Sequence, residues 1–410
     1  MTRLDPAALA GLDRLLASAD RELTARYPGA PRGRQPVHTC YVPADQLRQD
    51  QAAGWGRQAA GALADFAPDD DAFAAAMGLA PAMAAQVRPL VLAKLAAEPV
   101  EDLRIDFEDG YLGGDEDADA RAAAGALAAD VAAGRAPAFT GLRCKSLEPA
   151  SRSRAVRSLE LFLETLLGAG PLPDGFVITL PKVTSAAQVN AMARLCELLE
   201  QAYLLRAGRL AFEIQVETPQ LILGADGAAE IARCVHAGAG RLTGLHYGTY
   251  DYSASLGIAA AYQSMDHPAA DHARAVMQVA AAGTGVRLSD GSSNVLPGGD
   301  RDEVTAAWQL HARLVLRSLE RGFYQGWDLH PWQLASRYAA TYAFFREQLP
   351  AACARLRGYA GGVHHGVLEE PATGRALAGY LGRALDCGAV TEEEIVALAG
   401  RDRATIEAMR

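Results

Sequence analysis

The sequence predicts an α/β fold, namely a (β/α)8 TIM barrel with an N-terminal helical segment and a C-terminal helical extension. Eight short β-type runs alternate with helical runs, which is the pattern of such a barrel. The chain has 410 residues, 50% of them hydrophobic, so a barrel and its core can take up most of its length. No GxGxxG motif follows a strand, which disfavours a doubly wound open sheet.

The chain divides into three parts. Residues 1–35 have the pattern of an amphipathic helix followed by a loop rich in Pro, Gly and Arg. Residues 36–349 hold the predicted catalytic barrel, and residues 350–410 form a helical, charged C-terminal extension. The stretch 45–102 is longer than one helix needs, so we expect insertions there.

Each predicted strand is short and is bounded by Gly, Pro or Asp. The eight candidates are "HTCYVPA" (38–44), "LRIDFED" (103–109), "FTGLRCKS" (139–146), "FVITLPK" (176–182), "AFEIQVET" (211–218), "LTGLHYGTY" (242–250), "VRLSDGS" (286–292) and "GWDLHP" (326–331).

Two of the intervening helices carry clear end signals. In "TSAAQVNAMARLCELLEQA" (184–202), Ser185 is the expected N-cap, and Gln188 three residues later completes a capping box. In "DEVTAAWQLHARLVLRSLERG" (302–322), apolar residues recur with the helical period, and Gly322 is the expected stop.

Composition narrows the class of protein. The formal net charge is −10 and no block of Lys or Arg occurs, which disfavours a nucleic-acid or anionic-membrane partner. The six cysteines are scattered without a CxxC, as is typical of reduced thiols. The N-terminus lacks an apolar signal core, and no run of about 18 apolar residues occurs. We expect a soluble, cytoplasmic protein.

Charged side chains gather at the ends of the predicted strands, where a barrel places its chemistry. The segment "LRIDFEDGYLGG" (103–114) sets Asp106, Glu108 and Asp109 directly after an apolar strand. Helix capping or pairing with Arg and Lys explains any single acid equally well, but the whole set favours a site. The other strand ends contribute Arg143, Lys145, Lys182, Gln215, Glu217, Tyr250, Asp251, Asp290, Asp328 and His330.

These acids predict a metal site. Unpaired carboxylates inside a barrel are costly to desolvate, and a divalent cation removes that cost. Hard oxygen ligands suit Mg²⁺ or Mn²⁺. We assign the metal to Glu217 and Asp251, and we expect Arg143 and Lys182 to face an anionic substrate, because Arg grips a carboxylate with two hydrogen bonds.

Eight segments are similar, in the same order, to motifs of one family. They are "YVPAD", "DFEDGY", "LRCKS", "LPKVTS", "VETP", "YGTYDYSASLGI", "VRLSDGSSNVLPGGD" and "GFYQGWDLHPWQL". From about residue 38 to 375 the chain therefore resembles the HpcH/HpaI aldolase and citrate lyase beta-subunit superfamily, malate-synthase-like relatives included. Its members are metal-dependent carbon–carbon lyases on a (β/α)8 barrel.

The resemblance implies roles for particular residues. Glu217 in "VETP" and Asp251 in "YGTYDYSASLGI" fall on the metal ligands, and Arg143 in "LRCKS" falls on the carboxylate-binding arginine. Glu369 in "GVLEEPATGRAL" resembles a tail acid that serves as catalytic base in malate-synthase-like relatives. The roles that follow are catalytic for Arg143, Glu369, Asp106 and Lys182, and substrate-binding for Arg143, Glu108, Asp109, Gly248 and Thr249.

The chain departs from the family pattern in three ways. Val37 and His38 stand where the first strand usually begins with Arg-Ser, and Tyr250 replaces the acid before the metal Asp. The chain is also longer than a typical member, mostly before the second strand and after the eighth. These differences concern the substrate more than the metal site.

The expected function is a divalent-metal-dependent lyase or aldolase that acts on a small 2-oxo acid through a metal-stabilised enolate. An acyl-CoA-dependent enzyme of the citrate lyase or malate synthase kind, using glyoxylate or oxaloacetate, is the alternative. Lys182 as a Schiff-base amine is another, and a non-catalytic barrel that binds oxo acids is an alternative of a different class. The resemblance also implies a homo-oligomer that assembles through the C-terminal helices.

Overall fold

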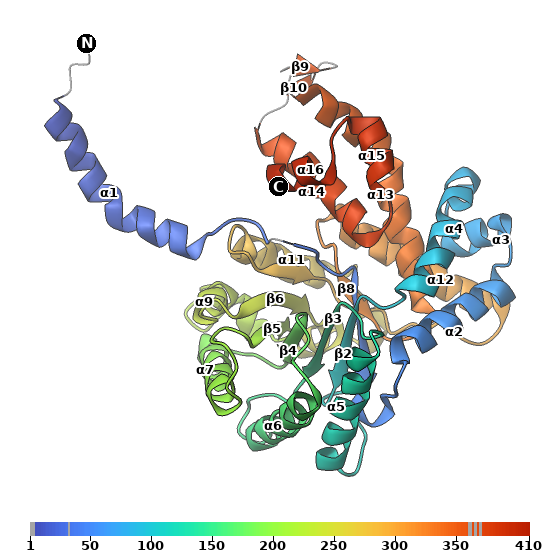
Figure 1. Ribbon diagram of the computed structural model, residues 1–410, viewed down its shortest axis with the longest axis horizontal. Coiled ribbons are helices and arrows are strands. Elements are labelled where there is room, and N and C mark those ends of the chain that lie inside the picture. Colours follow the sequence, from blue (N-terminus) through green and yellow to red (C-terminus); the bar gives the residue numbers. More distant parts are fainter. Residues whose placement is uncertain (1–4, 32, 360–362, 365–366, 369–370) are drawn as a thin grey trace.

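The computed structural model of the chain describes residues 5–31, 33–359, 363–364, 367–368 and 371–410. Eight parallel strands with flanking helices form a (β/α)8 barrel, so the predicted fold class is confirmed (Figure 1). Seven strands lie within the runs predicted for them, and β2 begins one residue before its run, at Asp102. The strands are β1 (His38–Pro43), β2 (Asp102–Asp106), β3 (Phe139–Arg143), β4 (Phe176–Leu180), β5 (Ala211–Val216), β6 (Leu242–Tyr247), β7 (Arg287–Ser289) and β8 (Gly326–Asp328).

The sheet runs in the order β7-β6-β5-β4-β3-β2-β1-β8, with every neighbouring pair parallel. The ring closes between β7 and β8. At that seam the backbone N–H of Asp290 donates to the carbonyl of Gln325 at 2.8 Å, and the N–H of Trp327 donates to the carbonyl of Gly291 at 3.2 Å. The carboxyl ends of all eight strands therefore meet around one mouth.

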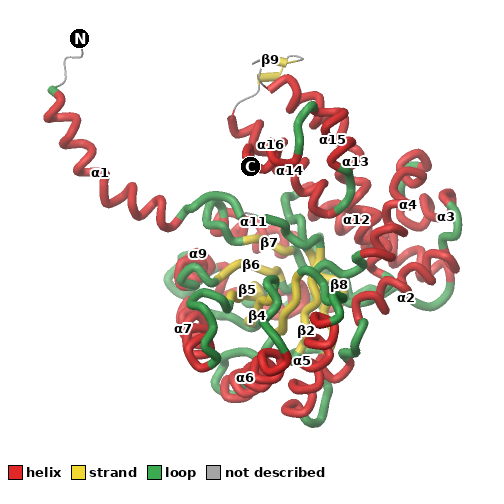
Figure 2. Tube along the Cα trace, viewed as in Figure 1, coloured by secondary structure: helices red, strands yellow, loops and turns green. Residues whose placement is uncertain are grey.

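Helices cover the outside of the barrel (Figure 2). The insertion expected within 45–102 consists of the short 3-10 turn η1 (Ala44–Gln46) and the three helices that follow it. The helices are α2 (Gln51–Phe66), α3 (Asp70–Met77), α4 (Pro81–Ala97), α5 (Glu116–Ala132), α6 (Arg152–Ala169), α7 (Ala186–Ala202), α8 (Pro219–Ile222), α9 (Glu230–Ala237), α10 (Thr249–Ser255), α11 (Pro268–Ala281) and α12 (Arg301–Glu320), with short 3-10 turns η1 (Ala44–Gln46) and η2 (Ala260–Tyr262).

The two ends of the chain are helical. Helix α1 (Pro6–Arg26) projects away from the barrel in Figure 1. At the other end α13 (Gln333–Gly358), the short strands β9 (Val363–His364) and β10 (Val367–Leu368), α14 (Pro371–Cys387), α15 (Glu392–Ala399) and α16 (Arg403–Met409) follow β8. The division into three domains stays a prediction, and α13 runs unbroken across its boundary after residue 349.

The helix-end signals have mixed outcomes. Gly322 follows α12 with φ of +84°, a left-handed conformation that suits glycine, as expected. The capping box predicted for α7 is wrong. Ser185 occupies the N-cap position without a side-chain cap hydrogen bond, and Gln188 Oε1 instead accepts from the backbone N–H of Thr184 at 2.7 Å and from its hydroxyl. The hydrogen bonds to Thr184 use the Gln188 oxygen that the box would need.

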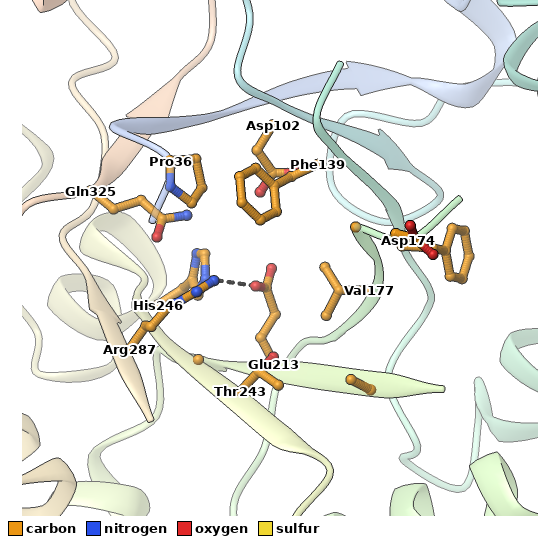
Figure 3. Close-up of a pocket in the computed structure, with 14 residues that line it drawn as sticks. Pro36, Asp102, Phe139, Asp174, Val177, Glu213, Thr243, His246, Arg287 and Gln325 are labelled. Atoms are coloured by element: carbon orange, nitrogen blue, oxygen red, sulfur yellow. Dashed lines mark ion pairs between the residues drawn. The ribbon is translucent and has the colours of Figure 1, made fainter. Parts of the chain in front are cut away.

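A charged network fills the lower part of the barrel. The fully buried Arg104 donates to Asp102 at 2.7 Å, to Glu213 at 2.6 Å and to the hydroxyl of Thr179 at 2.5 Å. Glu213 also pairs with His246, with 2.8 Å between Oε2 and Nε2 (Figure 3). A cavity of about 180 Å³ opens below this network, at the amino ends of the strands. The network separates that cavity from the opposite mouth, where the predicted site residues lie.

The helices within the described ranges include no single one long and apolar enough to cross a membrane. Two consecutive helices, α3 and α4, meet the length and composition test only when taken together, and they are bent by 99° relative to each other.

Candidate active site

The carboxyl ends of the strands bring the predicted acids together. Asp106 ends β2, with Glu108 and Asp109 in the loop after it, while Glu217 follows β5 and Asp251 lies in the first turn of α10. A cavity of about 430 Å³ opens at this mouth. Its lining includes Tyr41, Pro43, Asp106, Asp109, Gly110, Arg143, Thr249, Tyr250, Asp251, Ser292, Trp327 and Leu329.

Lys182 lies in the middle of the acids. Its Nζ is 2.6 Å from Oδ2 of Asp251, 3.3 Å from Oδ2 of Asp109, 3.6 Å from Oε1 of Glu108 and 3.8 Å from Oε1 of Glu217. The backbone of Lys182 has φ of +52°, which is uncommon for a residue with a side chain and is typical of functional sites. Four carboxylates therefore converge on one position that a positive charge occupies.

Glu217 is held in place by the chain on both sides. Its Oε1 accepts a hydrogen bond from the backbone N–H of Lys182 at 2.6 Å. A Cβ on Gly248 would lie 2.5 Å from Cβ and 2.8 Å from Oε2 of Glu217, so only glycine fits against it. Gly248 thus shapes the site through Glu217. Its neighbour Thr249 is buried and lines the cavity, where the substrate-binding role predicted for it stays a prediction.

Arg143 is clamped by Asp106. Its Nε and Nη2 donate to the two oxygens of Asp106 at 2.6 and 2.7 Å, a bidentate pair. The remaining Nη1 donates to Oε1 of Gln215 at 3.3 Å and lies 3.2 Å from Oε2 of Glu108. Asp106 also accepts from the backbone N–H groups of Glu108 and Gly110. Asp106 therefore orients the arginine, and the Nη1 edge of the guanidinium faces Gln215 and Glu108.

The mouth carries an excess of negative charge. Five carboxylates (Asp106, Glu108, Asp109, Glu217, Asp251) face two cations (Arg143, Lys182), which leaves three negative charges when all are ionised.

Burial and crowding disturb the titration of two of these acids. Burial raises the pKa of Glu217 to about 7, against the opposing charge of Lys182. Burial likewise raises the pKa of Glu108 to about 8, with the neighbouring Asp109 adding to the effect. For Asp109, burial is outweighed by its bond with Glu108 and the charges of Arg143 and Lys182, so its pKa is lowered. Glu108 is therefore the protonated member of that pair near neutral pH.

The residues present fit a divalent cation. The ammonium of Lys182 marks a position within 4 Å of four carboxylates, and every candidate ligand is a hard oxygen donor, as Mg²⁺ and Mn²⁺ prefer. With Glu108 protonated, four carboxylates still face two cations, and the negative charge left over favours a divalent cation. Glu217, 2% exposed, and Asp251, half-exposed toward the cavity, remain the two proposed ligands.

Lys182 does not suit a Schiff-base mechanism. Such an amine needs a depressed pKa so that it is neutral at the working pH. Burial alone would lower the pKa of Lys182, but Glu217, Asp251, Glu108 and Asp109 together raise it above the ordinary lysine value. The amine is a stably charged ammonium.

Glu369, predicted as catalytic base, lies outside the described residues. Among the cavity-lining residues that sequence reasoning missed are Tyr41 and Trp327, whose rings lie 4.9 Å apart. Counting with period two from Asp328 and His330 would place Trp327 on the opposite face, so the sequence held no signal for it.

His38, Cys40 and Asp328 also offer ligand atoms within 4.8 Å of one another. Their polar atoms already have protein partners: His38 pairs with Asp328 at 2.8 Å and accepts from the N–H of Glu101, and Asp328 accepts from Arg337. Desolvation raises the pKa of the Cys40 thiol. This buried trio ties β1, β8 and α13 together and is a structural network.

The fold and this site define a (β/α)8 barrel whose acidic mouth surrounds the ammonium of Lys182. The family model of a domain of unknown function, DUF6986, matches residues 16–410, and the chain belongs to that family. A search of curated proteins gave no match.

Solved structures share the barrel. A Haloferax volcanii malate synthase complex with magnesium and glyoxylate is 15% identical, with a TM-score of 0.50, and 92% of this chain aligns with 99% of that one. A pyruvate and acetyl-CoA ternary complex of the same enzyme is 14% identical, with a TM-score of 0.51 and the same two coverages. CitE from Mycobacterium tuberculosis, in complex with magnesium, acetoacetate and coenzyme A, is 18% identical with a TM-score of 0.45 and covers 91% and 99%. At these identities the malate synthase structures establish the common fold.

Proposed function

We propose that the protein is a divalent-metal-dependent carbon–carbon lyase that acts on a small 2-oxo acid, and that it belongs to the superfamily its motifs resemble. The observation that carries this proposal is the convergence of four carboxylates on one cation position at the carboxyl ends of the strands. The same convergence fits Mg²⁺ or Mn²⁺ as the cofactor.

Each residue would have a distinct task. Glu217 and Asp251 would hold the cation, which when bound supplies positive charge against the negative charge that develops on the oxo-acid oxygen. Arg143, fixed by Asp106, would bind the substrate carboxylate. Glu108, whose pKa is raised by burial to about 8, can hold and release a proton near neutral pH. Glu369 remains the proposed base from the tail of the chain.

The site has room for two reactants or for the two products of a cleavage. A second cavity of about 420 Å³ adjoins the first, and Asp109 lines both. It is lined by Glu108, Asp109, Lys145, Ser146, Glu148, Ser151, Lys182, Thr184 and Thr218. A carbon–carbon lyase must accommodate two fragments, which this arrangement supports.

An acyl-CoA-dependent reaction is the second candidate. The observation that favours it is the shared fold with a malate synthase in complex with pyruvate and acetyl-CoA. In that case an acyl thioester would take the second cavity and the oxo acid the first. We expect either enzyme to work in the cytoplasm as a homo-oligomer.

The test is a turnover screen of the full chain. Pyruvate, oxaloacetate and glyoxylate are each offered with aldehyde partners and with acetyl-CoA, with Mg²⁺, with Mn²⁺ and with EDTA. We expect turnover of at least one oxo acid that EDTA abolishes and Mg²⁺ restores. Turnover that survives EDTA contradicts the metal-dependent reaction, and metal-dependent binding of an oxo acid without any turnover identifies a binding barrel. The acetyl-CoA arms separate the two candidate reactions.

A further inference from the structure

Among the buried side-chain atoms of the described residues that lack a hydrogen-bond partner, three are donors close to Arg143. They are the hydroxyl of Tyr41, the side-chain amide nitrogen of Gln215 and the indole nitrogen of Trp327. These residues are 6%, 0% and 7% exposed, so water does not freely solvate them. A buried donor without a partner is costly, and native proteins rarely keep several together without a ligand or bound water.

The three donors belong to one layer of the barrel, beside Arg143. Tyr41 on β1 and Trp327 on β8 have rings 4.9 Å apart, and the guanidinium carbon of Arg143 lies 5.0 Å from the centre of the Tyr41 ring. Gln215 on β5 accepts from Nη1 of Arg143 through Oε1, which fixes the amide orientation and leaves its nitrogen free to donate. Tyr41, Arg143 and Trp327 all line the cavity at the mouth.

The chemistry of this layer selects an oxygen acceptor with negative charge. Indole and amide N–H groups and the phenol hydroxyl can donate, and the nearby guanidinium of Arg143 adds positive charge. Of the acids nearby, Asp106 is already satisfied by Arg143, and Glu213 is satisfied by Arg104, Thr179 and His246. A carboxylate, with two oxygens and several lone pairs, matches such a set of donors.

We propose that Tyr41, Gln215 and Trp327, beside the positive charge of Arg143, form the seat for a carboxylate group of the substrate. This inference rests on the proposed function and names which end of the oxo acid enters the barrel. The carboxylate lies against the aromatic pair, and the reacting carbons lie nearer the acids at the mouth. The substrate class is then 2-oxo acids with a free carboxylate, to the exclusion of their esters.

The test measures binding of pyruvate to the full chain with Mg²⁺ present, by ligand-observed NMR, with methyl pyruvate as the uncharged probe. Tyr41→Phe and Trp327→Phe each delete one donor and keep an aromatic ring. We expect each to weaken pyruvate binding about tenfold, the effect of one hydrogen bond to a charged acceptor. Gln215→Glu, which keeps the oxygen that Arg143 needs but adds negative charge, is expected to weaken it further. Methyl pyruvate should bind poorly to every form.

Two matched controls delete a buried donor that has a partner. Trp308 donates from its indole nitrogen to the carbonyl of Trp332 at 2.8 Å, and Tyr342 donates to the carbonyl of Cys387 at 3.0 Å. Trp308→Phe and Tyr342→Phe should lower the melting temperature and leave pyruvate affinity unchanged. Tyr41→Phe should show the reverse, with little loss of melting temperature in the free protein, because it removes only a hydroxyl that has no protein partner. Trp327→Phe also leaves a smaller ring, so its loss of pyruvate affinity is compared with that of Trp308→Phe, which makes the same change in volume.

The outcomes separate this inference from the function on which it rests. Unchanged pyruvate affinity in both Tyr41→Phe and Trp327→Phe overturns the carboxylate seat alone and leaves bound water as the partner of these donors. Equal binding of pyruvate and methyl pyruvate by the wild type also overturns it. Failure of the wild type to bind any of pyruvate, oxaloacetate and glyoxylate, with or without Mg²⁺, overturns the proposed function and the seat together.

Discussion

Lys182 gives the acidic mouth an internal counter-ion. Its ammonium lies within 4 Å of an oxygen of Glu108, Asp109, Glu217 and Asp251, so it neutralises part of a cluster that would otherwise repel itself. A divalent cation bound to the same acids would be repelled by this ammonium, because both are positively charged. Lys182 must therefore oppose metal binding, or move aside when the metal binds.

Replacing Lys182 by Met should strengthen metal binding. Removal of one positive charge next to the ligands lowers the repulsion on an incoming dication, and we expect the Kd for Mn²⁺ to fall by about tenfold or more. Electron paramagnetic resonance of Mn²⁺ measures it directly. Lys145→Met is the matched control, because Lys145 donates to the carbonyl of Phe107 on the neighbouring strand end. Weaker Mn²⁺ binding in Lys182→Met would contradict the competition.

Glu217→Gln and Asp251→Asn should each abolish detectable Mn²⁺ binding and activity while the fold stays intact. Each change removes a negatively charged oxygen donor but keeps nearly the same shape. Circular dichroism reports the fold and calorimetric titration the metal. Asp226→Asn, at an exposed acid outside the mouth, is the control. Tight metal binding by either site variant would remove that residue from the ligand set.

The raised pKa of Glu217 predicts how stability depends on pH without metal. Its value in the folded protein is about 7, above the ordinary 4.5, so the folded state binds this proton more tightly than the unfolded chain does. The contribution of Glu217 to the free energy of unfolding is therefore greatest below about pH 4.5 and falls as pH rises to about 7, by roughly 3 kcal/mol in all. The measurement is the difference in urea unfolding between wild type and Glu217→Gln across that range. A difference that does not change with pH would contradict the shift.

At the scale of elements, the junction between β6 and α10 positions the site. Gly248 follows the strand as the N-cap residue of α10, and its backbone N–H donates to the carbonyl of Val216 at 3.0 Å. Asp251 lies in the first turn of the helix. The close contact of Gly248 with Glu217 brings β5 and β6 together at the level of the acids. One small residue thus sets the spacing of both proposed metal ligands.

Gly248→Ala should disturb the site more than the fold. The added Cβ would lie 2.5 Å from Cβ of Glu217, and relieving that overlap costs about 1–3 kcal/mol and displaces the carboxylate. Chemical denaturation should show the loss of stability, and Mn²⁺ titration should show weaker metal binding. Gly125→Ala, at an exposed position inside α5 with open space around it, should instead stabilise the protein by about 0.5–1 kcal/mol. An unperturbed metal site in Gly248→Ala would show that β5 and β6 can separate freely.

The strands were predictable because apolar β-type runs bounded by turn residues are a local signal, and all eight fell where expected. The capping of α7 was not predictable in the same way. Thr184 and Ser185 compete for one Gln188 oxygen, and the path of the chain decides between them. The acids of the site were found as a set. The pairing of these side chains could not be predicted. The bond of Asp106 to Arg143 and the central position of Lys182 depend on the directions of side chains from several strands, which only the assembled barrel determines.

At the scale of the whole molecule, helix α1 suggests how copies associate. Leu9, Leu12, Leu16 and Leu23 recur with helical spacing and are 43% to 61% exposed, although a surface helix usually turns such residues inward. Exposed leucines in a row favour burial against another chain. The sequence resemblance pointed to the C-terminal helices for this role, and both surfaces remain predictions.

Light scattering should therefore give a mass above that of one chain. Leu12→Ser with Leu16→Ser should shift the protein toward smaller species, because the change removes apolar area from the stripe. Leu198→Ser changes a lone exposed leucine and should leave the mass unchanged. A monomeric wild type would contradict the predicted homo-oligomer. A variant that associates as the wild type does would show that α1 does not contribute to the association.

The seam between β7 and β8 determines where the barrel opens locally. Two backbone hydrogen bonds cross it, at Asp290 and Trp327, whereas the register of β1 with β2 or of β5 with β6 extends over four or five residues. Local opening should begin there, so these two amide protons should exchange with deuterium sooner than those between β3 and β4. Trp327 lies on that seam, so the transient parting of two strands would also loosen one wall of the pocket and give a bound molecule a way in or out.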